Sequence, residues 1–452
     1  MRLIPIAGCV VLLSAVCVLW AGPTPDQSVS NPHLIYTAAK GFNALAWLHG
    51  AARFPNGANL FVLDGENSRR LVPSFFASAD ASVSFDGTRV LFSGKQRPSD
   101  PWQIWEIPVA GAQPTRVASC QGDCIFPLYL PEERIVYAHK VHERFQLEAF
   151  ALKGGEALPL THIPANALPS DVLRDGRILF QASYPLGRAG QPELYTVYSD
   201  GSGIESYRCD HGGSRHSGRQ VSSGDIVFST NGKLARFTSA LAHQVDLTPP
   251  EGDYAGDVQE MPRGNWVLAV RSTARASYSI HEWNPRSNSS KTLLANDGFD
   301  LIQPRLLAPA QTPNRHPSGL HDWDGANVLC LNAYTSKLTF ADGAIATVRL
   351  YTQSSRGQKT LLGSSPVEKD GSFFLHVPAD QPLQFELLDQ AGKILQRENG
   401  WFWMRRGEQR VCVGCHAGPE RAPENAVPAV LVKSTKPVNL AISHSGHPKG
   451  GH

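Results

Sequence analysis

Residues 84–93 read SFDGTRVLFS, and this phrase decides the fold. A polar strand end meets the turn Asp86-Gly87, and a strongly apolar strand follows it directly. Asp-Gly between two strand-like runs favours a tight hairpin. Equivalent turns, Asp175-Gly176 and Gly224-Asp225, stand before other apolar runs. The phrase is therefore one copy of a repeated hairpin.

The repeat runs from residue 33 to about residue 310. Its mixed strand starts at Leu60, Ile104, Leu147, Leu194, Leu234 and Ile280, at intervals of 40 to 47 residues. Its apolar strand starts at Val90, Ile135, Ile178, Ile226 and Trp266. A four-stranded unit that recurs every forty-odd residues is typical of a β-propeller blade. Six copies predict six blades, and an open array of β-sandwiches is the alternative.

The apolar strand has no sixth copy after Leu306-Leu307. The segment Leu34-Ile35-Tyr36-Thr37 has the character to take its place. We expect this N-terminal strand to close the ring by completing the last blade, because closure removes an open sheet edge. The blade phrases resemble the TolB-like class of propeller repeats over residues 33–310, a likeness that implies the fold and says little of function.

Composition supports an all-β protein with more than one domain. The chain has 452 residues, 42% of them hydrophobic and 18% charged, with 40 Gly and 33 Pro. These values suit a loop-rich globular protein long enough for two or three domains. A formal net charge of +2 gives no reason to expect nucleic acid as a partner.

A second module follows the propeller. The breakers Pro313, Pro317, Gly319 and Gly325 mark residues 311–326 as a linker. Strand-like runs at 347–351, 372–377 and 383–388, with a last one around Trp401-Phe402-Trp403, predict a small β-sandwich over residues 327–403. We expect residues 404–433 to form a cofactor-attachment segment and residues 434–452 to be a mobile tail.

Residues 412–416 read CVGCH, the spacing of a c-type haem attachment site. The thiols of Cys412 and Cys415 can each add to one porphyrin vinyl group, and His416 then lies where its imidazole can bind the iron. Half of a zinc site and a redox disulfide are the alternatives. The predicted site is therefore one covalent haem c with Cys412, Cys415 and His416 as binding residues and His416 as the metal ligand, and no catalytic residue is recognised.

The sixth position of the iron stays open between several residues. Met404 is the nearest methionine, but it precedes Cys412 by only eight residues. His376 on the predicted sandwich and His444 or His447 in the tail are the histidine candidates. We expect His/His or five-coordinate iron, since no methionine follows the motif.

The first residues read as an export signal. Arg2 precedes an apolar run from Leu3 to Trp20, and Ala21 is suited to a cleavage site. Residues 1–21 are therefore expected to be a signal peptide that sends the chain to the periplasm or another extracytoplasmic space. The alternative is an uncleaved membrane anchor, because the run is just long enough to span a bilayer.

Export bears on the remaining cysteines among the eight in the chain. Cys120 and Cys124 flank a short turn, and an oxidising compartment favours a disulfide between them. The sequence leaves open whether Cys209 pairs with Cys330. His211 and His216 in one loop, and His139 with His142 in another, are expected to be polar loop residues rather than metal ligands.

The C-terminal half resembles the haem-bearing end of the hydrazine synthase alpha-subunit-like proteins. The matching phrases lie at residues 366–373, 377–380, 387–392 and 406–410 and at the motif itself. The likeness implies a propeller joined to this module, thioether bonds at Cys412 and Cys415, and His416 on the iron. It does not imply hydrazine synthesis, because the family's alpha subunit bears a second, catalytic haem and this sequence has no other CxxCH.

Three functions fit these features. The leading one is an exported monohaem c-type cytochrome that transfers electrons with a protein redox partner. The second is a periplasmic haem oxidoreductase subunit related to the alpha subunit, with substrate bound at the propeller. The third is a propeller scaffold or sensor. A membrane partner is expected only if the N-terminal segment stays attached.

Overall fold

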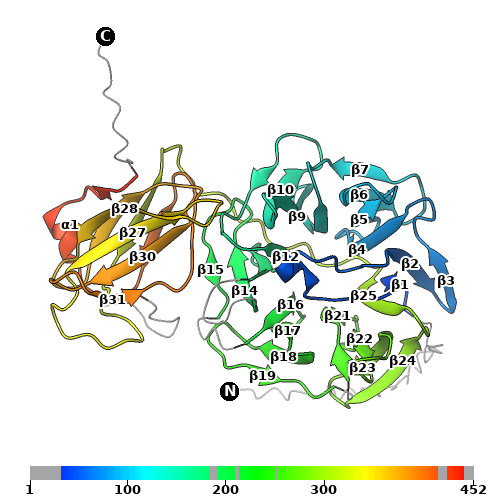
Figure 1. Ribbon diagram of the computed structural model, residues 1–452. Helices are drawn as coiled ribbons and strands as arrows, with labels where there is room; N and C mark the ends of the chain where they lie inside the picture. The colour runs from blue at the N-terminus through cyan, green and yellow to red at the C-terminus, as the bar shows by residue number, and fades with distance from the viewer. Residues whose placement is uncertain (1–31, 184–190, 209–212, 250–251, 416–424, 442–452) are drawn as a thin grey trace, which may run out of the picture.

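The computed structural model describes residues 32–183, 191–208, 213–249, 252–415 and 425–441. The predicted signal, His416, His444 and His447 lie outside these ranges. The described chain is almost entirely β-strand, with one short 3₁₀ helix, η1 (Ala46–His49), and one short α-helix, α1 (Ala429–Lys433). Within the described ranges, no helix combines the length and apolar character that crossing a membrane requires. Figure 1 shows a ring of blades with a smaller β unit beside it.

Six four-stranded or five-stranded sheets form the ring, as the repeat predicts. Blade 2 contains β4 (Ala77–Val83), β5 (Arg89–Lys95), β6 (Gln103–Pro108) and β7 (Thr115–Ala118); blade 3 contains β8 (Cys124–Leu130), β9 (Arg134–Val141), β10 (Arg144–Ala151) and β11 (Leu158–Pro159); blade 4 contains β12 (Ala167–Val172), β13 (Ile178–Ser183), β14 (Pro192–Val197) and β15 (Glu205–Ser206); blade 5 contains β16 (Arg215–Gln220), β17 (Ile226–Thr230), β18 (Lys233–Phe237) and β19 (Val245–Asp246); blade 6 contains β20 (Asp253–Tyr254), β21 (Gln259–Glu260), β22 (Trp266–Arg271), β23 (Ser279–Asn284) and β24 (Ser289–Leu294). The all-β, six-bladed prediction is confirmed.

Blade 1 joins the two ends of the ring. Its strand order is β25-β1-β2-β3, with β25 (Asp300–Leu306) from the end of the repeat and β1 (Leu34–Ala39), β2 (Ala58–Asp64) and β3 (Asn67–Arg70) from its start. Leu34 pairs with Leu306 on one side and with Leu63 on the other. The predicted closing strand therefore occupies the second position of this blade, where the other five blades have their apolar strand.

The innermost strand of each blade is not marked by the apolar pattern of the sequence. Four of them have a register shift next to a non-glycine residue in the left-handed region: Asp80 (φ 58°), Phe126 (φ 55°), Ser217 (φ 54°) and Gln303 (φ 54°). In blade 6 the left-handed Asp257 (φ 47°) lies between β20 and β21. These strands contain many small and polar residues, as in ASADASV of β4, because little space is left near the axis. They therefore lack the apolar alternation that marks a strand in sequence.

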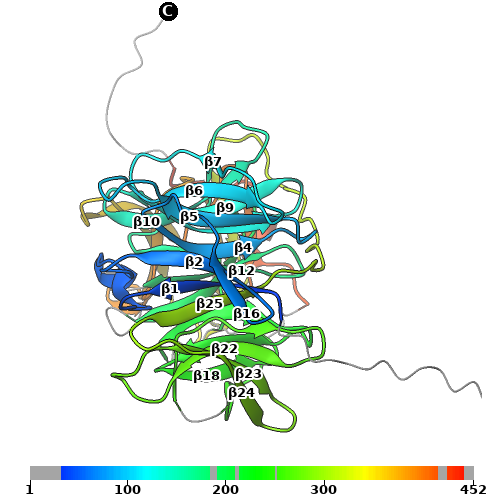
Figure 2. The ribbon, with the colours of Figure 1, turned by 90° about the vertical axis from the view of Figure 1, so that its right-hand side faces the viewer.

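An insert between β1 and β2, residues 40–57, packs across one end of the central channel. Trp47 and Leu48 of η1 contact Ile125 and Leu168 of two inner strands, and Phe54 packs on Ala79 and Ile302 of two others. Figure 2 shows the ring edge-on, with η1 on one side of it.

Two four-stranded sheets form the smaller unit, in the orders β32-β26-β29-β33 and β28-β27-β30-β31. Their strands are β26 (Ala326–Cys330), β27 (Thr347–Gln353), β28 (Lys359–Pro366), β29 (Phe373–Val377), β30 (Leu383–Leu388), β31 (Ile394–Arg397), β32 (Gln409–Cys412) and β33 (Val438–Asn439). The core between them contains Val328, Val348, Leu375, Leu387 and Met404. These sheets contain the predicted β-sandwich of residues 327–403, and β32 and β33 extend it beyond its predicted end.

Two details of the module differ from expectation. The strand expected at residues 401–403 is reduced to a single bridge between Leu383 and Phe402, because Trp401 and Trp403 turn toward the propeller. Residues 434–441, expected to be the start of a mobile tail, place β33 beside β29 and bury Leu440 in the sandwich core.

The linker crosses the propeller face as an extended strap, residues 308–316. Its backbone amides donate hydrogen bonds at both ends, from Ala310 to the Phe85 oxygen and from Asn314 to the Arg174 oxygen, each at 2.8 Å. Gly176, with φ 89°, lies so close to the Asn314 oxygen that a side chain there would overlap it. The strap is therefore fitted to blades 2 and 4.

Deleting residues 33–40 should destabilise the whole propeller, because β25 and β2 would each lose the partner between them. We expect the melting temperature, measured by circular dichroism, to fall by more than about 10 °C. Arg69→Ala, an exposed position on β3 of the same blade, is the control and should leave it unchanged. An unchanged melting temperature after the deletion would contradict the closure.

Candidate functional site

Cys412 and Cys415 lie at one edge of the sandwich. Cys412 is the last residue of β32, which runs parallel to β26, so that Cys412 stands beside Cys330. The Leu331 amide donates to the Cys412 oxygen at 2.9 Å, and the backbone of Cys415 forms an isolated parallel β-bridge with Ser336. The chain around the cysteines is therefore fixed to the sandwich backbone.

Gly414, between the two cysteines, packs directly on the loop after β26. A Cβ at this position would overlap the backbone oxygen of Thr335. No residue larger than glycine fits without moving one of the two segments, and the spacing of the cysteines would move with it.

A cavity of about 260 Å³ opens beside the two cysteines. This volume is just below the usual range of small-molecule sites. Blade 4 and its neighbourhood supply one wall, and the sandwich supplies the other. The apolar lining consists of Ile163, Phe180, Tyr195, Ile204, Val328, Phe373, Phe385, Trp401, Phe402 and Trp403, and Arg410, Glu398 and Glu205 are the charged residues around it.

The segment from Trp401 to Arg405 fastens the sandwich to the propeller. Trp401 and Trp403 belong to the same core as Phe180 and Tyr195 of blade 4. The buried Trp403 Nε1 donates to the Gly201 oxygen at 2.9 Å. This contact fixes the relative position of the cavity's two walls.

A polar contact beside this core depends on a neutral histidine. Arg405 Nη1 donates to His162 Nε2 at 2.7 Å and lies 2.9 Å from Asp380 Oδ1. Burial, and secondarily the Arg405 charge, lower the pKa of His162 to about 4. His162 also lies 3.7 Å from Asp380, but an imidazole that accepts from Arg405 is neutral, so this pair is not an ion pair near neutral pH.

The sulfurs of Cys412 and Cys415 are free thiols, as is the buried Cys330. Burial is the largest cause that raises the pKa of all three. Among the described residues, the group with metal-ligand spacing is Cys120, Cys124 and His139, and neither Cys412 nor Cys415 belongs to it. Cys412 and Cys415 are in the thiol state, which a haem-attachment site before thioether formation and a reduced redox pair share.

The residues present fit a covalently held haem. Two thiols with the CxxC spacing stand at the rim of a cavity whose walls are apolar and aromatic. Arg410, on the same rim, is held by Glu408 Oε1 at 2.6 Å and can face an anionic substituent. His416, the predicted iron ligand, lies outside the described residues.

Two sixth-ligand candidates are not at the cavity. Met404 is fully buried in the sandwich core. His376 Nδ1 is 2.8 Å from Asn327 Oδ1 on the neighbouring strand, and neither residue lines the cavity. The candidates His444 and His447 lie outside the described residues.

The other cysteine and histidine predictions have clear outcomes where they are described. Cys120 and Cys124 form the expected disulfide. Cys330 is a free thiol, and Cys209 lies outside the described residues. His216 is buried in β16 next to Ser217, and His139 contacts Glu148 at 2.9 Å; His211 lies outside the described residues.

A six-bladed propeller joined to a β-sandwich, with two thiols at a cavity between them, defines the class of this protein. Residues 332–417 match the family described as the hydrazine synthase alpha subunit middle domain. The hydrazine synthase subunit alpha of Kuenenia stuttgartiensis is 34% identical over 64 residues, which are 14% of this chain and 8% of that protein. The match therefore spans a small part of the relative's length.

The likeness in fold is much wider. The structure of Kuenenia stuttgartiensis hydrazine synthase superposes with a TM-score of 0.80 at 17% identity, over 89% of this chain and 71% of that chain. TolB from Acinetobacter baumannii gives a TM-score of 0.47 at 15% identity, over 62% of this chain and 67% of that chain. The predicted likeness to the hydrazine synthase alpha-subunit-like proteins is confirmed.

Gly414→Ala should displace the cysteine segment from the Thr335 loop, because the added methyl group has no space. We expect a loss of about 1–3 kcal/mol in the free energy of unfolding, measured by urea titration. Gly319→Ala is the matched control, since nothing lies within 4 Å of its added Cβ. Equal stability of both variants would contradict the close approach.

His162 should make the protein less stable in mild acid. Its pKa of about 4 in the folded state is below the usual value of 6.5. Between pH 6.5 and pH 4 the unfolded chain therefore binds a proton that the folded chain does not, and the free energy of unfolding decreases as the pH falls. Between pH 7 and pH 5 this amounts to about 2 kcal/mol. His162→Gln should remove that part of the pH dependence, and exposed His49→Gln should leave it intact.

Proposed function

We propose that this chain is an exported monohaem c-type cytochrome that exchanges electrons with a protein redox partner. Covalent haem c supplies one-electron redox chemistry when bound. The observation that supports the proposal most is the pair of free thiols, Cys412 and Cys415, at an apolar and aromatic cavity. In this proposal both cysteines hold the group through thioether bonds, and His416 is the axial ligand by the sequence motif.

The cavity residues have separate roles in this proposal. Phe373, Phe385 and Trp401 line the cavity and would exclude water from a group held there, which lowers the local dielectric constant. Arg410, oriented by the buried carboxylate of Glu408, binds an acidic substituent at the rim. The sandwich and blade 4 act together, because each supplies one wall.

The partner is expected to approach along β32. This strand stands at the end of its sheet, and Val411, directly before Cys412, is 60% exposed. An exposed apolar side chain next to the attachment site suits the small interfaces of transient electron-transfer complexes. The periplasmic or extracytoplasmic location belongs to the same proposal and depends on residues 1–21 acting as an export signal.

A second candidate is a haem oxidoreductase subunit of hydrazine synthase alpha type. The shared fold over 89% of this chain favours it, since the propeller as well as the sandwich corresponds to a part of that enzyme's structure. The two candidates differ in whether the iron has a free position for a substrate.

Expression with a periplasmic cytochrome c maturation system should give a protein whose haem survives denaturing electrophoresis, detected by its peroxidase activity in the gel. The double variant Cys412→Ser, Cys415→Ser should lose the signal completely. Cys330→Ser is the control, because this buried thiol lines the same cavity but lies outside the motif. Haem retained by the double variant, or a colourless wild type, would refute the proposal.

Carbon monoxide separates the two candidates. Slow or absent binding by the reduced protein supports electron transfer. Rapid binding shows an open iron position and favours the oxidoreductase.

A further inference from the structure

The propeller contains a second cavity, which shares no lining residue with the cavity at the cysteines. It has a volume of about 810 Å³, within the usual range of small-molecule sites. All six blades contribute to its wall near the ends of their inner strands, and the strap supplies residues 308–311 and 313. We call this cavity the funnel.

The funnel stands at one end of the central channel, and the insert of residues 40–57 packs across the other. Arg53 reaches from that insert into the channel and forms a buried ion pair with Asp80 at 2.7 Å. Gln303 Nε2 also donates to Asp80, at 2.8 Å. A cavity with its far end filled by side chains is suited to holding a ligand rather than passing it through the ring.

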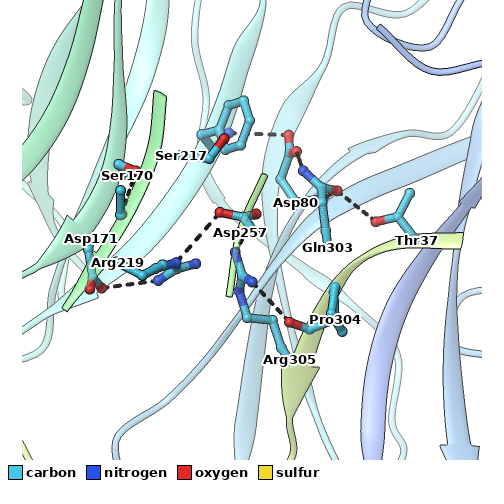
Figure 3. A network of polar contacts seen from close by, with 12 residues as sticks. Thr37, Asp80, Ser170, Asp171, Ser217, Arg219, Asp257, Gln303, Pro304 and Arg305 are labelled. Carbon is cyan, nitrogen blue, oxygen red and sulfur yellow. Dashed lines mark hydrogen bonds and ion pairs between the residues drawn. The ribbon is translucent and has the colours of Figure 1, made fainter. Parts of the chain in front are cut away.

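Two buried arginines form the floor of the funnel (Figure 3). Arg219 Nη1 lies 3.0 Å from Asp171 Oδ1, and its Nε lies 3.6 Å from Asp257 Oδ1. Arg305 Nη2 lies 2.9 Å from Asp257 Oδ2. The floor therefore balances two guanidinium groups with two carboxylates, and both arginines share Asp257.

Arg305 still has one hydrogen-bond donor without a partner among the described residues. Its Nη1 donates to the Pro304 oxygen at 2.9 Å, but its buried Nε has no hydrogen-bond partner among the described residues. Burial first, and then the neighbouring Arg219 charge, lower the pKa of the Arg305 guanidinium. A negative charge placed nearby would offset both effects.

The rim adds more positive charge than negative charge. Arg174, Arg263 and Arg286 are exposed lining residues there, and Glu260 is the carboxylate on the same rim. Arg174 Nη2 donates to the Val221 oxygen at 2.7 Å. Glu260 is already engaged, since Ser222 Oγ donates to it at 2.6 Å. Together with the neutral floor, the rim leaves an excess of two positive charges around a concave site.

We infer that the funnel binds a small organic anion through a carboxylate or phosphate group, with Arg263 and Arg286 as its first contacts and Arg305 at its floor. Guanidinium groups bind both kinds of oxyanion in a bidentate manner, and the focused charge of a cleft draws such ligands in. The volume fits an organic molecule rather than a bare inorganic ion. This binding does not depend on the haem proposal.

Isothermal titration calorimetry of the full mature chain tests the inference with citrate and adenosine monophosphate as probes, and with uncharged adenosine. At least one anion should bind with a Kd below about 1 mM and bind more weakly at high salt. The probe that binds tells a carboxylate site from a phosphate site. The double variant Arg263→Ala, Arg286→Ala should weaken binding by at least about tenfold.

A matched control removes the same charge elsewhere. Arg116→Ala with Arg356→Ala takes two exposed arginines that do not line the funnel, so its Kd should stay within about twofold of wild type. Equal weakening in both double variants would reduce the effect to net charge and overturn the inference. It is overturned equally if neither anion binds with a Kd below about 1 mM, or if uncharged adenosine binds as tightly as the anion that binds.

Discussion

The position of Trp403 is the constraint on which the rest of this architecture depends. Its indole is fully buried between the sandwich and blade 4, and its Nε1 hydrogen bond to Gly201 has no substitute in an apolar core. Glu408 adds to the same fastening, since it accepts from the Arg405 and Gly203 amides and from Arg410. The cavity at the cysteines exists only while this contact holds, because each unit supplies just one of its walls.

Inside the ring, electrostatics rather than apolar packing sets the arrangement near the axis. Asp80 is a buried carboxylate and Asp257 is largely buried; each is paired with an arginine, and each has a backbone in the left-handed region. Buried ion pairs and left-handed non-glycine residues both cost stability unless the surrounding structure compensates them. Asp80, Asp257 and Gln303 line one small cavity near the axis together with Arg219 and Arg305, and the funnel is the open end of that polar interior.

Similarity in sequence covers a much shorter part of the chain than similarity in fold does. The family match is confined to residues 332–417, whereas the fold of hydrazine synthase is shared over 89% of the chain at 17% identity. A blade needs a pattern of apolar and turn residues, which many sequences satisfy, so the propeller can diverge while it keeps its fold. The segment at Gly414 has no such freedom, because its backbone meets the loop after β26 there without space for a side chain.

The sequence alone determined the features that are local or periodic: the repeat, the closing strand at residues 34–37, the sandwich, the Cys120–Cys124 disulfide and the place of the CxxCH motif. Apolar alternation and turn residues follow from the backbone geometry of strands, so they are visible within ten residues. Only the tertiary structure decided the parallel pairing of β32 with β26, the strand at Val438–Asn439, the cavity walls and the charges of the funnel. Those depend on groups as far apart in the sequence as the Gly201 backbone oxygen and the Trp403 indole, or the side chains of Asp80 and Gln303, and no pattern along the chain records which of them meet.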